Sequence, residues 1–329
     1  MAAQQGLHAR SFKLAATAYH EAVGGGMSAD SVMRITVGWG EQVVAQRSAE
    51  AEQANQVAQR GERPTDQRIE PVAPISGQAN ISTDGTMVLV RQEGWKEVKI
   101  TAISAVTVEA RPAGTESRRR QDPLVQLHAH SYQAGLWDAD TMGQQQYAEG
   151  LRRGVEAAVP LTSANDGAPW IERITQTNFP RAIQIVDWSH ASGRMWKVGN
   201  EKFGEGSVAS RQWVEGRLDE LWEGHVDSAV EALKGLDLDQ EKYSAEVRQA
   251  PGYFEGNRER MRYAEFRAAG YPIGSGTVES GGRSVVQHRM RRPGRGWTRD
   301  HGQAILAALS ELHSERFDQA WRMVYSPPN

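Results

Sequence analysis

A change of hydrophobic period near residue 80 constrains the fold of this chain more than any other feature. Beyond it, apolar and polar residues alternate in short runs rich in Val, Ile and Thr, the residues favoured in strands. Three such runs, over residues 80–90, 97–106 and 107–113, predict three strands of a meander. The next patterns predict a helix within 144–159, a strand over 158–167, a helix over 170–179 and a strand over 181–190. This order of elements predicts an α/β fold built on a mixed sheet.

Helical patterns flank this core on both sides. Residues 12–58 predict two helices joined by a glycine-rich turn, with Ser28 as the N-cap of the second. Such a pair is typical both of a DNA-binding helix-turn-helix and of an ordinary helical hairpin. Residues 60–79, rich in Pro, Gln and Gly, show no periodicity and predict a linker. Residues 196–269 predict a run of charged helices that interrupts the α/β pattern.

Two last helices are expected over residues 276–288 and 300–323, separated by a break at Arg292-Pro293-Gly294. We therefore divide the chain into five parts. They are a helical segment with a candidate helix-turn-helix (1–59), a linker (60–79), the first part of the core (80–195), a helical insertion (196–269) and the C-terminal helices (270–329).

Composition excludes several classes of protein. The chain of 329 residues has no cysteine, so disulfides and thiolate zinc sites are excluded. A hydrophobic fraction of 39% and ten Trp residues favour a folded protein over a disordered one. No apolar run reaches the length of about 20 residues that crosses a bilayer, and no signal-peptide pattern is present, so we expect a cytoplasmic protein.

Three acidic residues are candidates for chemistry. Asp84 lies in the first predicted strand, Asp166 follows the fourth, and Glu279 lies on a late helix. Because ligand groups converge at strand ends in α/β sheets, these distant carboxylates are expected to meet there. Carboxylate oxygens suit Mg²⁺ or Mn²⁺, and two ions roughly 3.5–4 Å apart promote phosphodiester chemistry. We find no Walker-type loop, no GxSxG and no HExxH that would compete with this hypothesis.

Arginines follow Glu279 closely. They are Arg283, Arg289, Arg291, Arg292, Arg295 and Arg299. The formal net charge of −3 counts mildly against a nucleic-acid-binding protein, but a local cluster of arginines is what phosphate binding requires. The cluster beside a carboxylate predicts metal-dependent chemistry on nucleic acid.

Each of these residues also has a purely structural interpretation. Asp84-Gly85 and Asn165-Asp166-Gly167 are typical turn sequences, and Glu279 alone would be a solvated helix residue. Trp95 and Trp297 could stack on an unpaired base or simply pack against the core.

Three segments together resemble a known family. They are STDGTMVLV followed by GWKEVKITAISAV, then SANDGAPWIERITQTNFPRAIQIVDWSHA, and finally GYPIGSGTVESGGRSVVQHRMRRPGRGW with the helix after it. From about residue 80 to the C-terminus the chain resembles the DDE transposases of bacterial insertion sequences, the ISKra-type group, which is related in layout to the Mutator-like transposases. The last block is the most specific.

The resemblance implies an RNase H-like mixed-sheet core with a helical insertion, preceded by a small helical segment. Asp84, Asp166 and Glu279 match the catalytic triad that holds Mg²⁺ or Mn²⁺, as two ions. Asp187 and His190 match an Asp-x-x-His signature that organises the site, and Asp187 is an alternative to Asp166 as the second aspartate. Asp187 and His190 could equally form a hydrogen-bonded pair that only fixes the end of a strand.

The expected activity is DNA transposition, with phosphodiester hydrolysis at element ends and strand transfer to target DNA. The expected partners are those DNA ends, the target DNA and a second copy of the chain, in a nucleoid-associated location. Arg283, Arg289, Arg291, Arg292 and Arg295 are expected to contact DNA phosphates. The alternatives are a decayed or domesticated transposase that only binds DNA and a non-transposing nuclease of the same fold.

Overall fold

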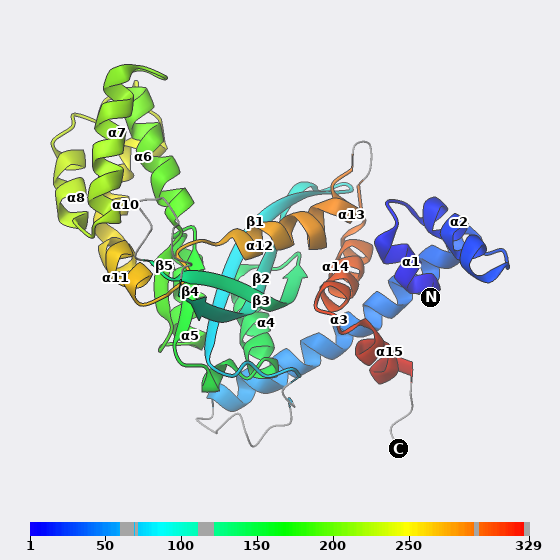
Figure 1. Ribbon diagram of the computed structural model, residues 1–329. Helices are drawn as coiled ribbons and strands as arrows, with labels where there is room; N and C mark the ends of the chain where they lie inside the picture. The colour runs from blue at the N-terminus through cyan, green and yellow to red at the C-terminus, as the bar shows by residue number, and fades with distance from the viewer. Residues whose placement is uncertain (60–68, 70–71, 111–121, 293–295, 326–329) are drawn as a thin grey trace.

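A five-stranded mixed sheet forms the centre of the protein in the computed structural model, which describes residues 1–59, 69, 72–110, 122–292 and 296–325 (Figure 1). The strands are β1 (Gln78–Val90), β2 (Gly94–Glu109), β3 (Leu124–Gly135), β4 (Leu161–Asn165) and β5 (Ile183–Val186). Their order across the sheet is β3-β2-β1-β4-β5. β1, β2 and β3 are antiparallel neighbours, whereas β4 runs parallel to both β1 and β5. The predicted mixed α/β class is confirmed, and so is the predicted order of elements apart from the place of the third strand.

The third strand differs from the prediction. Residues 107–109, expected to begin a separate strand, continue β2, because no turn residue follows Val106. The third strand of the sheet is instead β3, whose sequence LVQLHAHSYQAG has no clean alternation. It lies at the edge of the sheet, and its first half is largely exposed, so it needs few apolar residues. Residues 111–113 lie outside the described part of the chain.

Helices connect the parallel strands. α4 (Ala139–Arg152) begins and ends earlier than predicted, because Asp138 caps its first turn and Gly154 adopts a left-handed φ of 63° beyond its last. A 3₁₀ turn, η2 (Val155–Ala157), leads from α4 to β4, and α5 (Pro169–Asn178) lies where the prediction placed it.

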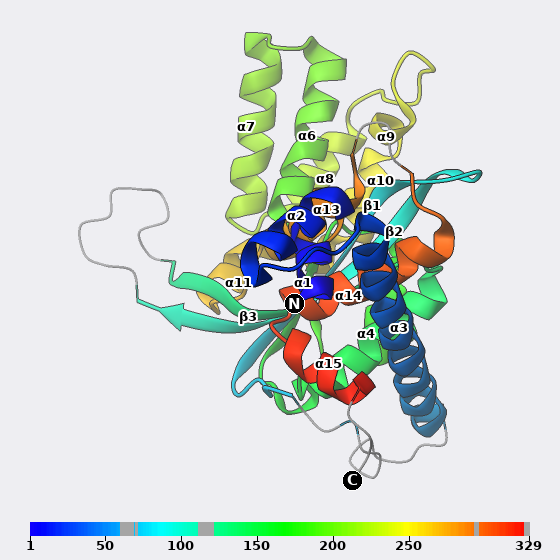
Figure 2. The same ribbon diagram turned by 90° about the vertical axis from the view of Figure 1, so that its right-hand side faces the viewer.

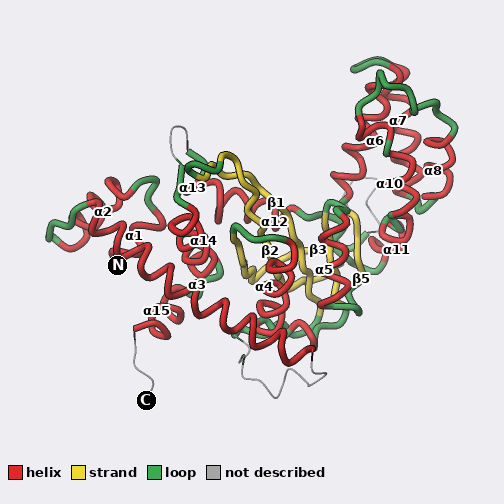
Figure 3. The backbone as a smooth tube through the Cα atoms, turned by 180° about the vertical axis from the view of Figure 1, so that it is seen from behind, coloured by secondary structure: helices red, strands yellow, loops and turns green. Residues whose placement is uncertain are grey.

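Two apolar clusters pack on opposite faces of the sheet. One joins Ile100 and Val88 to Val278 and to α14, and the other joins Ile81 and Ile103 to α4 and to Phe179, which directly follows α5. Figure 1 accordingly shows α12 in front of the sheet, and Figure 3 shows α4 and α5 before it from behind.

Three helices precede the sheet: α1 (Ala2–His8), α2 (Phe12–Val23) and α3 (Ala29–Gln59). The predicted helix pair is present, and the Ser28 hydroxyl accepts a hydrogen bond from the Ser31 N–H at 3.1 Å. α3 runs along the molecule and contributes Trp39 to one apolar cluster and Ala51 to the other (Figure 1). Of the predicted linker over 60–79, residues 60–68 and 70–71 lie outside the described residues.

The region after β5 is helical, as expected, and packs around an apolar cluster of its own. It contains α6 (Trp188–Phe203), α7 (Val208–Trp222), α8 (Val226–Lys234), α9 (Ala245–Arg248), α10 (Ala250–Gly256), η3 (Arg258–Arg260) and α11 (Tyr263–Ala268). Figure 2 shows α6 and α7 projecting away from the sheet. No helix in the described ranges has both the length and the apolar character that a membrane span requires.

The chain returns to the sheet as one continuous helical stretch followed by two helices. α12 (Gly276–Gly281) continues through a π-helix, η4 (Gly282–Gln287), into α13 (His288–Met290). The helix expected over 300–323 is two helices, α14 (Arg299–His313) and α15 (Phe317–Tyr325). The break falls at Glu315, whose φ of 58° is left-handed and incompatible with a continuous helix.

Candidate metal centre

Acidic residues lie together where the parallel strands end, at their carboxyl termini. β4 and β5 each end immediately before an aspartate, Asp166 and Asp187. β1 pairs with β4 only as far as Ile81, and beyond that the Thr83 N–H donates to the Asn165 side chain at 2.6 Å. Asp84 therefore lies beside the end of β4. Since carboxyl ends of parallel strands line the ligand crevice of such sheets, this edge is the natural place for a site.

Asp187, His190 and Glu279 form a group that could hold a metal ion. One potential ligand atom from each lies within 4.8 Å of the other two. Asp187 is 1% exposed, Glu279 is half-buried and His190 is exposed. The sequence interpretation placed Asp187 and His190 on a strand, but they lie at the start of α6, with Asp187 as the N-cap. A helix start is what brings residues three apart to the same side.

Four hydrogen bonds hold the Asp187 carboxylate. One oxygen accepts from the His190 N–H at 2.9 Å, from the Ser189 hydroxyl and from His190 Nδ1 at 3.1 Å. The other accepts from the Ser275 N–H, just before α12. Burial alone raises the pKa of Asp187, but these bonds outweigh it and hold the pKa well below its ordinary value. Asp187 is thus fixed as a carboxylate that ties β5, α6 and α12 together.

The hydrogen bond with Asp187 also raises the pKa of His190, and although burial opposes the increase, the charges of Asp187, Asp166 and Glu279 add to it. Negative charges therefore dominate the surroundings of His190. An imidazole so placed can either carry a proton or offer a nitrogen to a cation.

Glu279 approaches from the sheet's covered face. It follows the buried Val278 in α12, and its carboxylate lies 3.5 Å from the Ser275 hydroxyl. The π-helix begins three residues later, at Gly282, and Gln287 within it donates to the Thr86 hydroxyl at 2.8 Å. Short π-helical segments often occur at functional sites, where they change the direction of side chains within a helix.

Asp84 faces the same helix. It pairs across the sheet with Ile100, which packs with Val278, so its side chain is on the α12 side of β1. Burial raises the pKa of the Asp84 carboxyl, and the charges of Asp166 and Glu279 add to the increase, while a hydrogen bond from the Gly85 N–H and the charge of His190 oppose it. This excess of negative charge is the electrostatic condition that a bound cation relieves.

Asp166 has a local role in the structure. Its carboxylate accepts a hydrogen bond from the Ala168 N–H at 2.9 Å, and its carbonyl oxygen accepts one from the Tyr253 hydroxyl at 3.0 Å. Burial raises the pKa of Tyr253 to about 12, which keeps that hydroxyl a donor. Asp166 is close enough to Asp84 and His190 for its charge to affect both, but it is not in the group within 4.8 Å.

The predicted arginines separate into different environments. Arg283 and Arg291 are exposed, and Arg291 lies over the Trp95 ring at 5.5 Å. Arg292 is half-buried, and Arg295 lies outside the described residues. Arg289 is 2% exposed, with its guanidinium over the Phe12 ring at 4.5 Å and near Trp297 at 5.1 Å. This packing accounts for its burial, and its predicted contact with DNA remains a prediction.

The two tryptophans differ in the same way. Trp297 packs against the apolar cluster and donates from its indole to the Met290 carbonyl at 3.2 Å. Trp95 is 54% exposed, beside the turn between β1 and β2. The packing interpretation therefore fits Trp297, and Trp95 has a ring surface open to solvent.

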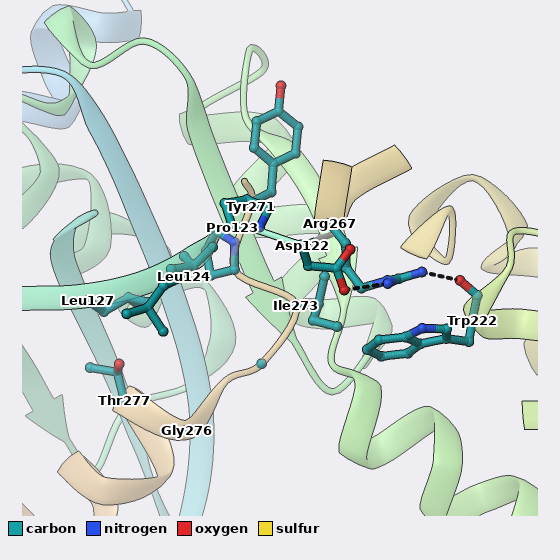
Figure 4. Close-up of a pocket in the computed structure, with 13 residues that line it drawn as sticks. Asp122, Pro123, Leu124, Leu127, Trp222, Arg267, Tyr271, Ile273, Gly276 and Thr277 are labelled. Atoms are coloured by element: carbon teal, nitrogen blue, oxygen red, sulfur yellow. Dashed lines mark hydrogen bonds and ion pairs between the residues drawn. The ribbon is translucent and has the colours of Figure 1, made fainter. Parts of the chain in front are cut away.

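A separate pocket of about 510 Å³ lies beside the loop that enters α12 (Figure 4). Arg267 of α11 binds the Asp122 carboxylate at 2.5 Å and the Trp222 carbonyl at 2.7 Å, and its guanidinium stacks on the Trp222 ring at 3.7 Å. None of the acidic candidates lines this pocket. The contacts of Arg267 connect α11 to the residues just before β3 and to the end of α7. All three lie next to the loop that carries Ser275.

The sequence predicts His190 only as an auxiliary residue. The Asp-x-x-His spacing was the signal that could have placed it with Asp187 in one group of potential metal ligands. Neither a family model nor a curated protein matches this chain.

Proposed function

We propose that this protein is a DNA transposase of the DDE type. In this reaction it would hydrolyse a phosphodiester at each end of a mobile element and join the freed 3′-hydroxyl to target DNA. The observation that carries the proposal is the convergence of acidic residues at the carboxyl ends of the parallel strands, where Asp187, His190 and Glu279 form one group and the charges of Asp84 and Asp166 act on it. The order of helices and strands and the helices between β5 and α12 are compatible with an RNase H-like core carrying an insertion.

The donor set suits hard divalent cations such as Mg²⁺ or Mn²⁺. Carboxylate oxygens predominate, and Asp84 bears an electrostatic load that a cation would relieve. Glu279 belongs both to the group that the structure brings together and to the triad implied by the resemblance. We therefore assign it as the shared ligand, with Asp84 and Asp166 completing the triad and Asp187 and His190 beside them.

When bound, such ions would lower the pKa of a water molecule and stabilise charge on the attacking and leaving oxygens. The protein's own residues do the positioning. Asp187 locks the start of α12 onto β5 through the Ser275 N–H. Because Nδ1 of His190 faces Asp187, Nε2 is the nitrogen left for a cation or a substrate proton. Arg283, Arg291 and Arg292 would neutralise backbone phosphates, and two element ends would require at least a dimer on DNA.

A strand-transfer assay with the element's flanking ends and Mg²⁺ or Mn²⁺ tests this function. Glu279→Gln should abolish cleavage and retain DNA binding. The control is Glu265→Gln, which replaces an exposed glutamate of α11 that pairs with Arg262 and should change neither property. Activity lost with Asp166→Asn and kept with Asp187→Asn would assign the triad of the resemblance, and the reverse would assign Asp187.

The alternatives give different results. Wild-type protein that binds the ends without cutting them would indicate a DNA-binding derivative of a transposase. Cleavage without strand transfer would indicate a nuclease, and full cleavage by Glu279→Gln would refute the assignment of the site.

A further inference from the structure

A second pocket, of about 420 Å³, lies where α1 and α14 meet the helical stretch that begins with α12. Three histidines line it from three different elements: His8 at the end of α1, His288 at the start of α13 and His313 at the end of α14. Arg283 of the π-helix and the buried Arg289 line it as well, together with Ser280 and Ser284. No motif in the sequence connects these residues.

The pocket is lined by basic and neutral groups alone. None of its lining residues is a carboxylate, and Arg283 forms no ion pair with any carboxylate in the described residues. Burial lowers the pKa of His313, and the charges of His8 and His288 lower it further, and the pocket holds no carboxylate to oppose this effect. An anion bound in the pocket would favour the protonated form of His313.

The donors suit a phosphate better than a metal. Imidazoles, a guanidinium and a hydroxyl converge here, and a phosphate group has several oxygens to accept from them. The Ser284 hydroxyl donates to the Ser280 carbonyl at 3.0 Å, so it is the Ser280 hydroxyl that is available to a ligand. A cation would be repelled by Arg283, and these histidines are not among the metal-competent groups of the described residues.

The pocket lies on the same helical stretch as Glu279. At a rise of about 1.5 Å per residue, Arg283 is about 6 Å and His288 about 13 Å along the axis from Glu279. A DNA strand advances about 3.4 Å per nucleotide, so these distances correspond to roughly two to four nucleotides.

We propose that the pocket formed by His8, Ser280, Arg283, His288 and His313 binds a phosphate group of a DNA strand, roughly two to four nucleotides from the phosphodiester that lies at the candidate metal centre. This placement rests on the proposed function. Bound there, the phosphate would fix the strand's register by joining the N-terminal helix α1 to the helix that carries Glu279. The same donors would accept free inorganic phosphate, and the experiment separates these two sources.

DNA binding without divalent ions is the first measurement, by fluorescence anisotropy of a labelled duplex in EDTA between 50 and 200 mM salt. Removing one phosphate contact lowers the slope of log affinity against log salt by about 0.9. Over that fourfold range, the loss of affinity in Arg283→Gln, which removes a full positive charge, should shrink by about 3.5-fold as salt rises, and His288→Gln should weaken binding as well. Both side chains are exposed, so neither variant should fail to fold. Arg322→Gln, an exposed arginine on α15, is the matched control and should keep the wild-type slope.

The second measurement is the response of histidine side-chain NMR signals to inorganic phosphate. Shifts of His8, His288 and His313 that disappear in Arg283→Gln, together with the lowered slope, would support the proposal. Shifts with an unchanged slope would overturn the DNA placement and indicate a site for free phosphate. If neither the shifts nor the slope change were observed, the proposed pocket would be overturned altogether. Wild-type protein that lacks strand transfer but shows both effects would refute the proposed activity and leave the phosphate pocket standing.

Discussion

The position of His190 is compatible with two roles, a structural one and one in metal binding. Its Nδ1 contacts a buried aspartate, as in a purely structural pair, yet it also stands within ligand distance of Glu279. The structural pair would satisfy both partners internally and would bind no metal. A metal-binding measurement therefore separates the two.

If His190 contributes to the site, we expect His190→Gln to weaken Mn²⁺ binding about tenfold or more, because it removes the imidazole from the group of Asp187, His190 and Glu279 while leaving a residue of similar size. Isothermal titration calorimetry of the protein with MnCl₂ measures this affinity. His225→Gln, an exposed histidine at the start of α8, is the control and should bind Mn²⁺ like the wild type. Equal affinities in all three proteins would leave His190 with the structural role alone.

Trp95 is the residue best placed to stack on an unpaired base. Its ring is 54% exposed and has Arg291 nearby, and stacking of a base on such a ring contributes about 1–3 kcal/mol. Trp95→Ala should therefore weaken binding of a DNA end with a single-stranded flank, measured by anisotropy, and leave the melting temperature unchanged. Tyr325→Ala, which truncates another exposed ring on α15, should not weaken it. A comparable loss in both variants would argue against stacking.

At the scale of elements, a buried network of charges holds α3, α4 and α14 together. Glu149 on α4 and Glu311 on α14 are fully buried, and Arg316 binds both, at 2.7 and 3.1 Å. Arg47 of α3 binds Glu311 at 2.8 Å, and Arg152 closes the network onto Glu149. These contacts, with the ion pair between Arg152 and Glu50, fix the long helix α3 against α4 and α14.

Removing one partner from such a network leaves an uncompensated buried charge. Glu149→Gln should lower the free energy of unfolding by roughly 3–5 kcal/mol, measured by urea denaturation, because Arg152 and Arg316 lose their main counter-charge. The exposed pair of Arg262 and Glu265 provides the control, since Glu265→Gln should change stability by less than about 1 kcal/mol. Similar small effects in both would show that the network contributes little.

At the scale of the whole molecule, the same carboxylates set the response to acid. Burial raises the pKa of Glu50, Glu149 and Glu311, but their arginine partners outweigh it and leave each below the ordinary 4.5. Below that value the unfolded chain binds protons that the folded chain does not. Stability contributed by these groups is therefore complete at neutral pH and is lost as the pH falls below about 5.

Unfolding midpoints in urea should consequently decrease steeply between pH 5 and pH 3, and Glu149→Gln should flatten that decrease. Far-UV circular dichroism at each pH measures the midpoints. A wild-type profile as flat as that of the variant would contradict the depressed pKa values.

The local elements were predictable because their signals are local. The alternation in β1 and β2, the Ser28 cap and the short apolar runs of β4 and β5 depend on neighbours a few residues away. β3 and the break between α14 and α15 were not predictable. An edge strand needs little apolar patterning. The helix breaks at Glu315 because this residue adopts a left-handed conformation, and no glycine stands at this position to indicate it in the sequence.

The sequence by itself determined the mixed α/β class, the order of the elements and the acidic residues that end the parallel strands. Only the tertiary structure decided which side chains share a site. It placed His190 beside Glu279, buried Arg289 against Phe12 and gathered His8, His288 and His313 around one pocket. The physical reason is that helix and strand periodicity arises within one segment. Burial and electrostatic interaction depend on segments that are distant in the chain and meet only when it packs.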